Sequence, residues 1–424
     1  QKGETFDGKV KRLARSLCDG TEHQWILEDI FGNMRFLPAG RVQSAMGADK
    51  LVTAYNCFVS GEIKDSMDSI MDRAKEAAET MRRGGGIGYD FSKVRPKGNT
   101  IKSLESQASG PISFMSIFDA VCQTISSSGH RRGAQMGVLR IDHPDIVDFI
   151  TAKRNSDKLT GFNISLGITD KFMEALSKED DSFDLIFEGI VHETVSANEI
   201  WNLAMESTWD WAEPGVLFID RIKEMNNLYY CEDISATNPC GEQPLPPYGA
   251  CLLGSFNLTK YLTGDTGNYT FNFEQFKEDI PHVVRAQDNV VDRTIYPLRE
   301  QEDEAKNKRR MGLGITGLAN AGEMLGFEYG SKPFLRWMEK VFACLRDNTY
   351  YASAKLAEEK GAFPLYREEY LKGNFIRTLP SFVQKEIRKH GIRNSHLTSI
   401  APTGTISLVA DNVSGGIEPV FSHS

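Results

Sequence analysis

The sequence lacks a long apolar run. No stretch approaches the roughly 18 consecutive apolar residues of a membrane-spanning helix, and nothing near Gln1 has the pattern of a signal peptide. It also lacks a strong excess of one charge, since 49 Lys and Arg stand against 58 Asp and Glu for a net charge of −9. This mildly acidic balance argues against direct binding of nucleic acid or of a membrane surface. These absences favour a cytoplasmic protein.

Cysteine motifs with a standard spacing are absent too. No pair of the seven cysteines has C-x-x-C spacing, which argues against a zinc site or a thioredoxin-type motif. An odd number of widely spaced cysteines in a long acidic chain is not typical of a secreted disulfide scaffold. None of the eight histidines falls in H-E-x-x-H, so a zinc hydrolase is not expected and no metal site is predicted. We expect reduced thiols, at Cys18, Cys57, Cys122, Cys231, Cys240, Cys251 and Cys344.

The 424 residues are 40% hydrophobic and include 24 Phe, 13 Tyr and 5 Trp, enough for a large core. Short strand-like runs alternate with helical patterns along the whole length, which favours a parallel α/β architecture. No repeat, linker or clear boundary is visible. We therefore expect one α/β domain over residues 1–424, with a helical lead-in over residues 1–37. Because the chain begins with Gln1 rather than Met, we expect a trimmed copy of a longer protein.

The spacing of apolar residues locates the main elements. Helices are predicted over 10–36, Ser66–Arg83, Pro111–Ile125, Ser196–Trp209, Phe273–Val291 and Lys332–Lys360. Strands are predicted over Gly137–Ile141, Phe162–Leu166, Val216–Ile219 and Leu397–Ala401. The helix that follows Ser196 has a capping box, with Glu199 three residues later.

Two glycine-rich stretches imitate nucleotide-binding motifs. Residues 312–317 match G-x-G-x-x-G, but charged residues precede them where a dinucleotide fold needs an apolar strand. Residues 84–88 lack the Lys-Ser/Thr of a P-loop. We interpret the first stretch as a strand or turn that requires small residues.

The most informative stretch is Asn238-Pro239-Cys240-Gly241-Glu242. If it is extended, alternation places Asn238, Cys240 and Glu242 on one face. An amide can orient a hydroxyl, a carboxylate can remove its proton, and a thiol can exchange a hydrogen atom or attack. The alternative is a buried cysteine beside a turn, with Glu242 solvated. The Pro-rich segment that follows and a second cysteine at 251 favour the functional interpretation.

In that context the stretch resembles the finger-loop signature of the ribonucleotide reductase catalytic subunit, and further segments resemble this family in the family's order over roughly residues 36–420. Residues 56–58 and 251 resemble the strands of a redox cysteine pair, and 65–70 an effector-binding segment. Residues 84–95 resemble a glycine-rich substrate turn and the start of a first specificity loop, and 129–137 a second specificity loop. Residues 401–407 resemble a phosphate-binding turn. The residues at 238–242 are most similar to those of the adenosylcobalamin-dependent branch of the family.

The resemblance implies a ten-stranded α/β barrel with Cys240 on a central finger loop. It also implies a mechanism in which a thiyl radical on Cys240 takes the 3′ hydrogen atom of a ribonucleotide. Glu242 would remove the 3′-OH proton, and Asn238 would hold the ribose hydroxyls. Cys57 and Cys251 would reduce the substrate and finish as a disulfide, which requires Cα atoms about 4.4–6.8 Å apart. The four other cysteines are assigned to packing.

The resemblance assigns further residues to binding. Substrate contacts are expected at Gly84, Gly85, Thr403, Gly404, Thr405, Ile406 and Ser407; effector contacts at Asp65, Ser66 and Arg95; and specificity-loop contacts at Arg131, Arg132 and Gln135. The hydroxyls and backbone N–H groups of 403–407 suit a phosphate independently of the family. The alternatives are an ordinary polar loop at 403–407, a helix N-cap at Asp65 and a surface cation at Arg95.

The family implies a radical source outside this chain. Adenosylcobalamin and a separate ferritin-like dimetal subunit both stay open, since no cobalamin or metal ligand set is visible. Implied partners are dNTP or ATP effectors, a thioredoxin- or glutaredoxin-type reductant and a second copy of the chain. The segment before Pro38 is too short for an N-terminal ATP-binding cone, and the C-terminal end looks truncated. Rival functions are a nucleotide-binding regulator on a degenerate reductase scaffold and a thiol-dependent transferase.

Overall fold

The computed structural model describes residues 3–101, 105–127, 131–154 and 158–420. The chain folds as two compact units. The first unit combines residues 1–56 with 250–424, and the second comprises residues 57–249. The predicted α/β class is confirmed, whereas the single domain, the ten-stranded barrel and the central finger loop stay predictions.

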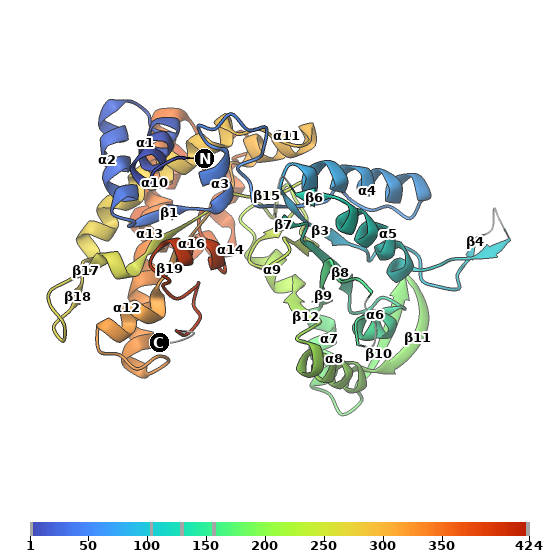
Figure 1. Ribbon diagram of the computed structural model, residues 1–424. Coiled ribbons are helices and arrows are strands. Elements are labelled where there is room, and N and C mark those ends of the chain that lie inside the picture. The colour runs from blue at the N-terminus through green and yellow to red at the C-terminus, as the bar shows by residue number, and fades with distance from the viewer. Residues whose placement is uncertain (1–2, 102–104, 128–130, 155–157, 421–424) are drawn as a thin grey trace. The chain divides into compact units, whose positions relative to one another are not determined.

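The second unit is built on a parallel sheet with the strand order β12-β9-β8-β3-β2 (Figure 1). These strands are β2 (Cys57–Val59), β3 (Gly86–Asp90), β8 (Gln135–Arg140), β9 (Phe162–Ile168) and β12 (Gly215–Phe218). Helices connect successive strands, as parallel pairing requires. The strand predictions for 137–141, 162–166 and 216–219 are confirmed to within a few residues.

One face of this sheet carries the large side chains. Tyr89 and Phe162 point to this face and pack with Phe91 and Phe118 in a cluster with ring centroids 4.8–6.2 Å apart. Helix α4 (Met67–Arg82) contributes buried residues to the same core, and Phe118 belongs to α5 (Pro111–Thr124). Figure 1 shows both helices beside β3. The opposite face of β3 presents glycines, because side chains alternate along a strand.

The remaining elements of the second unit surround this sheet. They are β4 (Thr100–Ile101), β5 (Ser106–Gln107), β6 (Ser126–Ser127), β7 (Arg131–Arg132), α6 (Ile146–Thr151), α7 (Asp170–Leu176), β10 (Ser182–Phe187), β11 (Ile190–Ser196), α8 (Ala197–Trp211), α9 (Ile219–Met225), β13 (Ala236–Thr237) and β14 (Pro244–Leu245). The Ser196 half of the predicted capping box of α8 is confirmed, because Ser196 Oγ accepts a hydrogen bond from the Glu199 N–H at 3.1 Å.

The first unit holds a smaller sheet with the order β1-β16-β19, in which β16 pairs antiparallel with β1 and parallel with β19. Its elements are α1 (Phe6–Leu17), α2 (Thr21–Gly32), β1 (Phe36–Pro38), α3 (Gly40–Ala45), β15 (Ala250–Cys251), β16 (Leu253–Asn257), η1 (Leu258–Tyr261), β17 (Leu262–Thr263), β18 (Thr270–Phe271), α10 (Phe273–Arg293), α11 (Arg299–Lys308), β19 (Gly312–Thr316), α12 (Leu318–Met324), α13 (Lys332–Lys360), η2 (Glu368–Lys372), α14 (Asn374–Arg377), α15 (Ser381–His390) and α16 (Gly404–Val409).

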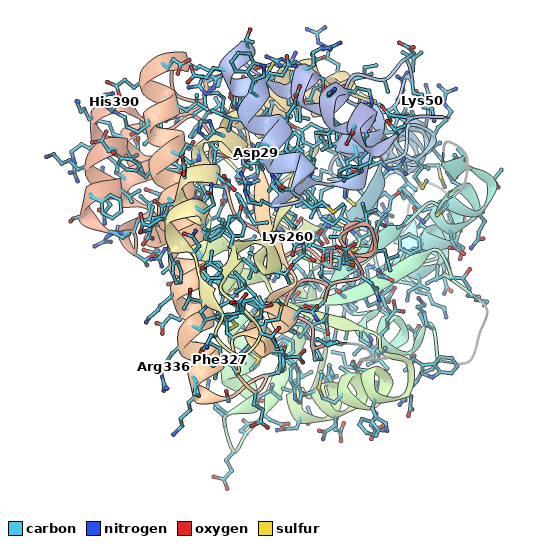
Figure 2. All side chains as sticks on the ribbon, turned by 60° about the vertical axis from the view of Figure 1, so that its left-hand side comes forward. Asp29, Lys50, Lys260, Phe327, Arg336 and His390 are labelled. Atoms are coloured by element: carbon cyan, nitrogen blue, oxygen red, sulfur yellow. The ribbon has the colours of Figure 1, made fainter. Side chains whose placement is uncertain are left out.

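The longest helix of the described residues, α13, has the predicted bounds. Helix α13 begins shortly after Phe327, and Arg336 lies near its start. Helix α15, which ends at His390, packs along the C-terminal half of α13 (Figure 2). The G-x-G-x-x-G stretch lies in β19, as its interpretation as a small-residue strand predicts. A Cβ on Gly314 would lie 2.3 Å from the Ser399 carbonyl oxygen, so close backbone approach explains the glycine.

The helical pattern predicted over 10–36 is confirmed as two helices, α1 and α2, because the chain turns at Asp19-Gly20, where Gly20 has φ +97°. One element prediction is wrong. The strand expected over 397–401 forms only an isolated bridge between Thr398 and Leu313. The spacing of apolar residues does not reveal a two-residue interruption between helices. It also does not show whether a strand has a partner with which to form a ladder.

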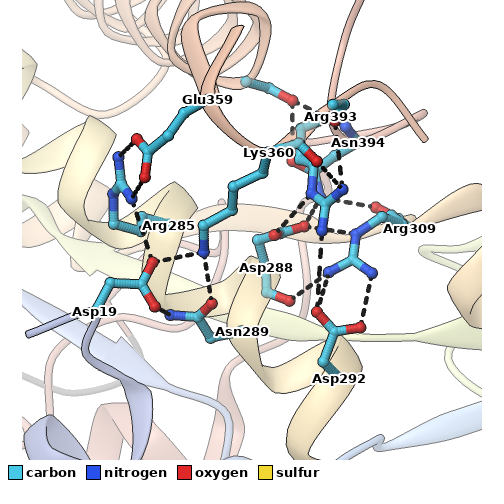
Figure 3. Close-up of polar contacts among 12 residues, drawn as sticks. Asp19, Arg285, Asp288, Asn289, Asp292, Arg309, Glu359, Lys360, Arg393 and Asn394 are labelled. Carbon is cyan, nitrogen blue, oxygen red and sulfur yellow. Dashed lines mark hydrogen bonds and ion pairs between the residues drawn. The ribbon is translucent and has the colours of Figure 1, made fainter. Parts of the chain in front are cut away.

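A network of buried charges joins the helices of the first unit (Figure 3). Asp288 of α10 is fully buried and accepts hydrogen bonds from Arg309 Nε at 2.9 Å, Arg393 Nε at 3.0 Å and Asn394 Nδ2 at 2.8 Å. Arg309 also pairs with Asp292, one turn further along α10. Each buried charge therefore has a charged or amide partner, as a stable interior requires.

Within the described residues, no helix is long and apolar enough to cross a membrane. That part of the chain also contains no cluster of three or more His, Cys, Asp or Glu side chains able to hold a metal ion.

Candidate active site

The Asn-Pro-Cys-Gly-Glu stretch forms the loop of a β-hairpin. Strands β13 and β14 pair antiparallel, with Ala236 opposite Leu245 and Thr237 opposite Pro244. The stretch is therefore a turn, so the condition under which alternation would place the three side chains on one face is not met. Gly241 has φ +85°, a conformation that glycine adopts without strain, and this reverses the chain. The Gly241 N–H bonds to the Asn238 carbonyl at 3.0 Å.

The turn, rather than strand alternation, brings the expected side chains together. Asn238 is fully buried and donates from Nδ2 to Glu242 Oε2 at 2.6 Å. Its Oδ1 accepts the backbone N–H of Gln243 at 2.9 Å. Both ends of the Asn238 amide are thus held, and the amide in turn fixes the Glu242 carboxyl group.

The hairpin lies on the glycine-bearing face of the sheet. A Cβ on Gly88 would lie only 1.7 Å from the Thr237 carbonyl oxygen, and one on Gly86 would lie 2.9 Å from Pro239 Cγ. Neither strand position can therefore carry a side chain while the hairpin stays where it is. The sequence Gly-Ile-Gly in β3 places Ile87 towards the helices and leaves the other face open for the hairpin.

Cys57, in β2, lies next to the hairpin. It is paired in register with Gly86, and a Cβ on Gly86 would lie 3.3 Å from Cys57 Sγ. Desolvation, assisted by the nearby Glu242 carboxylate and Cys240, raises the pKa of the Cys57 thiol to about 12. Cys57 is therefore a protonated thiol at neutral pH. Four of the five residues expected to be catalytic gather on the second unit.

Glu242 and Cys240 differ in exposure. Desolvation raises the pKa of Glu242 above its ordinary value of 4.5, although the hydrogen bond from Asn238 opposes the rise. A carboxyl group with a raised pKa is a better proton acceptor near neutral pH. Cys240 is exposed, so a reagent from outside the chain can reach its thiol.

The fifth expected catalytic residue, Cys251, lies in β15 of the first unit and is fully buried. Its expected partner, Cys57, belongs to the second unit. The pairing of these two thiols therefore stays a prediction. Among the cysteines assigned to packing, Cys122 and Cys344 are buried in helices, and Cys18 and Cys231 are partly buried.

The glycines expected to face a substrate have different surroundings. Gly84 has φ +95° at the end of α4, which explains a glycine by backbone conformation alone. A Cβ on Gly85 would lie 2.7 Å from the Phe58 ring and 2.9 Å from Thr80 Cγ2, so core packing alone accounts for this glycine. Contact of either with a substrate stays a prediction.

The expected phosphate turn lies in the first unit at the start of α16. Thr403 has φ +54°, and its hydroxyl lies 3.1 Å from that of Thr316 and accepts the Gly416 N–H at 2.9 Å. Ser407 Oγ donates to the Gly404 carbonyl at 3.2 Å. These two hydroxyls therefore support the fold of the turn. Gly404, Thr405 and Ile406 form the first turn of α16, and phosphate binding there stays a prediction.

The expected effector residues do lie together. Asp65 accepts hydrogen bonds from the Arg95 backbone N–H at 3.1 Å and from Arg95 Nε at 2.7 Å. Ser66, rather than Asp65, is the N-cap of α4, because its hydroxyl accepts the Ser69 N–H. Asp65 also lines a cavity of about 410 Å³ with Lys64 and Arg140. The Asp65–Arg95 ion pair fixes the positions of these two side chains. Effector binding by them stays a prediction.

The second specificity loop lies partly outside the described residues, which omit 128–130. Arg131 and Arg132 form β7, and Gln135 opens β8. Gln135 is fully buried, accepts from Tyr89 OH at 2.8 Å and donates to the Phe118 carbonyl at 3.2 Å. Both ends of its amide are used within the core. Its proposed part in reading a nucleotide stays a prediction.

Sequence reasoning missed one residue at the hairpin. Asn163 of β9 donates from Nδ2 to the carbonyl oxygen of Pro239, directly before Cys240, at 2.8 Å. The signal was present in the sequence, because Asn163 and Ser165 alternate with Phe162, Ile164 and Leu166. Alternation assigns the apolar residues to the helix-covered face and Asn163 to the face that carries the hairpin.

Comparisons with known proteins bear on this arrangement. The family model described as the barrel domain of ribonucleotide reductase matches residues 55–424. A vitamin B12-dependent ribonucleoside-diphosphate reductase of Thermoplasma acidophilum is 38% identical over 400 residues, which cover 93% of this chain and 49% of the relative.

Two further relatives have similar names. One from Mycobacterium tuberculosis, a vitamin B12-dependent ribonucleoside-diphosphate reductase, is 36% identical over 428 residues, covering 99% of this chain and 58% of its own length. A vitamin B12-dependent ribonucleotide reductase of Streptomyces coelicolor is 30% identical over 415 residues, covering 86% of this chain and 43% of its own length. The chain spans about half the length of the curated relatives it matches.

Proposed function

The chain belongs to the ribonucleotide reductase family, and on this premise we propose that it carries the catalytic centre that reduces ribonucleotides to 2′-deoxyribonucleotides. The observation that carries the proposal is the hairpin loop in which Asn238 holds Glu242 at 2.6 Å beside Cys240, next to the Cys57 thiol. The names of two relatives favour ribonucleoside diphosphates over triphosphates as substrates.

In the proposed reaction Cys240, as a thiyl radical, removes the 3′ hydrogen atom of the ribose. Glu242 accepts the proton of the 3′-OH, a task suited to a carboxyl group whose pKa is raised by desolvation. Asn238 orients the ribose hydroxyls through its amide. The rigid hold on both ends of that amide supports this positioning role.

Cys57 supplies the proton for the departing 2′-OH. Its pKa of about 12 supports this role, because the group stays a thiol at neutral pH and carries the proton to be donated. Cys57 and Cys251 then supply the two electrons of the reduction as they join in a disulfide, and the Cys240 thiol returns its hydrogen atom to C3′, which restores the thiyl radical. A thioredoxin- or glutaredoxin-type dithiol would restore the pair for the next turnover.

Adenosylcobalamin is the radical source that the names of the relatives favour over a dimetal subunit. When bound, it would supply the organic radical that removes the hydrogen atom of the Cys240 thiol. The chain fits this requirement in one respect: Cys240 is exposed, and a Cβ on Gly241 would meet nothing within 4 Å. An external group can therefore approach the loop.

The finer features of the proposal follow from family membership. They are a ten-stranded α/β barrel in one domain, a central finger loop, phosphate contacts at 403–407 and substrate contacts at Gly84 and Gly85. Effector nucleotides would meet Asp65, Ser66 and Arg95, and Arg131, Arg132 and Gln135 would report effector identity to the substrate base. We also propose a homodimer and a cytoplasmic location.

A reductase assay tests the proposal. The full chain is assayed for deoxynucleotide formation from a ribonucleoside diphosphate with dithiothreitol, first with adenosylcobalamin alone and then with a dimetal radical subunit. We expect turnover with adenosylcobalamin and its complete loss in Cys240→Ser. Cys18→Ser is the control, since Cys18 lies in the first unit and its thiol donates to the Arg15 carbonyl within the same short stretch of chain.

Retained turnover in Cys240→Ser would refute the radical role of this thiol. Turnover only with the dimetal subunit would refute the choice of cofactor while leaving the reaction intact. Absence of turnover with both sources would refute the proposed function for this chain.

A further inference from the structure

The hairpin that carries Cys240 spans three neighbouring strands of the parallel sheet. Gly88 of β3, Met136 of β8 and Asn163 of β9 stand in one register row, because Gly88 pairs with Met136 and Met136 with Asn163. Residues in register on parallel strands point to the same face. These three positions therefore form one continuous strip beneath the hairpin.

Each end of the strip meets the backbone of the hairpin. At one end, Gly88 leaves room for the Thr237 carbonyl, which lies 1.7 Å from the site of a Cβ. At the other end, Asn163 Nδ2 donates to the Pro239 carbonyl at 2.8 Å. Thr237 ends β13 and Pro239 follows two residues later in the loop, so the sheet contacts the hairpin at two carbonyl groups shortly before Cys240.

The two contacts have different physical character. The contact at Gly88 is steric and limits how far the hairpin can move towards the sheet. The hydrogen bond from Asn163 is directional and limits rotation of the peptide between Pro239 and Cys240. Fixing that peptide fixes the backbone from which the Cys240 side chain departs, and Asn238 of the same loop holds Glu242.

Asn163 is itself exposed and lines a cavity of about 180 Å³ at the amino ends of β8 and β9. An exposed amide gains little from a hydrogen bond that replaces one with water. The stability of the fold therefore does not account for an asparagine at this position. Its contact with the loop of the reactive thiol does.

We infer that Asn163 is a positioning residue for the Cys240 thiol, acting through its hydrogen bond to the Pro239 carbonyl. The inference rests on the proposed function. Asn163 holds the peptide before Cys240 so that the sulfur meets the ribose C3′–H bond in a reactive geometry. Since the contact of Asn163 is with the protein backbone, its removal lowers kcat and leaves KM unchanged.

Replacement of Asn163 by Leu tests this, because Leu has a similar size and no donor. We expect kcat for ribonucleotide reduction to fall by about 10²-fold, the cost of a misplaced reacting group, with KM within about twofold of the parent. The backbone amides of Asn238 and of residues 240–243 should exchange with deuterium roughly fivefold faster, the effect of losing one hydrogen bond of ordinary strength. Asn163→Asp provides a second, isosteric variant without the donor.

The matched control is Asn348→Leu. Asn348 donates from Nδ2 to the Cys344 carbonyl at the same distance of 2.8 Å, but within α13 of the first unit. It should leave kcat and the exchange of the hairpin amides unchanged. If Asn348→Leu lowered kcat as much as Asn163→Leu does, the loss of any side-chain amide hydrogen bond would be sufficient to lower kcat. That result would overturn the inference.

Two further outcomes separate this inference from the proposed function. If the parent chain reduces ribonucleotides while both Asn163 variants keep their kcat, the positioning role is wrong and the function stands. If the parent chain shows no reduction with either radical source, the function fails, and unchanged amide exchange in the Asn163 variants would independently refute the hold on the hairpin.

Discussion

Two carboxyl groups, the buried Asp288 of the first unit and the half-buried Glu242 of the second, have different electrostatic surroundings. In the first unit, Asp288 is fully buried between two arginines and an asparagine amide. In the second unit, the hydrogen bond to Glu242 comes from the neutral amide of Asn238, and desolvation raises its pKa. Asp288 is paired with two cations, whereas the raised pKa of Glu242 suits a carboxyl group that exchanges a proton.

Asp19 extends this contrast at the edge of the first unit. Burial alone would raise its pKa, but hydrogen bonds from Lys360, Arg285 and Asn289 lower it to about 2. The stability that this carboxylate contributes is therefore present above its ordinary pKa of 3.8 and is lost as the pH falls towards 2. A carboxylate surrounded by cations suits a structural role, whereas a desolvated carboxyl group that is held by an amide suits proton transfer.

The largest expected effect breaks the scaffold. Asp288→Asn places an amide N–H₂ against the donors of the two arginines and removes a fully buried carboxylate that pairs with both of them. We expect the free energy of unfolding to fall by about 3–5 kcal/mol, measured by urea denaturation. Asp292→Asn is the control: Asp292 bonds the same Arg309, but its side chain is 48% exposed, so a loss of no more than about 1 kcal/mol is expected. Equal losses of unfolding free energy in the two variants would show that burial does not distinguish Asp288 from Asp292.

The next effect disturbs the hairpin without changing any charge. Gly88→Ala inserts a Cβ where the Thr237 carbonyl oxygen lies, so the hairpin must move away from the sheet. We expect kcat to fall by about 10²-fold, as for a displaced reacting group, in the same reductase assay. Gly40→Ala adds a Cβ that meets nothing within 4 Å and should be silent. Full activity in Gly88→Ala would contradict the close seating of the hairpin.

The smallest effect concerns pH. A general base must be ionised, so kcat/KM should rise with pH through the pKa of Glu242, which lies above 4.5. The hydrogen bond from Asn238 lowers that pKa, so Asn238→Ala should shift the acid limb of the remaining activity to higher pH. The measurement is the pH profile of kcat/KM.

Asn226→Ala is the matched control for the pH experiment. Asn226 donates from Nδ2 to Glu232 at 3.0 Å, an amide–carboxylate bond in the same unit but at a different place. It should leave the acid limb where it is. An acid limb that stays in place in Asn238→Ala would show that a group other than Glu242 controls the profile.

Much of the fold could be predicted from periodicity. The bounds of α13 and the cap of α8 follow from local patterns, since apolar spacing and Ser-x-x-Glu act within one helix. The split between α1 and α2 was missed because Asp19-Gly20 interrupts the pattern for only a few residues. The strand expected at 397–401 failed because a ladder depends on a partner that sequence does not provide.

For the candidate site, the sequence singled out Asn238, Cys240 and Glu242 on the supposition of an extended segment. A hairpin turn at Gly241, rather than an extended strand, brings the amide to the carboxylate. Asn163 was missed because its role depends on a contact with a segment 76 positions later in the chain.

By itself, the sequence determined the α/β class, the thiol, amide and carboxylate of the reactive loop, and its resemblance to the reductase family. These follow from residue type and local order, which a single chain displays directly. Only the tertiary structure decided that Gly86 and Gly88 leave room for the hairpin, that Cys57 lies beside it in surroundings that raise the pKa of its thiol, and that Asn163 donates to the Pro239 carbonyl. Those properties arise from desolvation and from contacts between distant segments, and both exist only once the chain has folded.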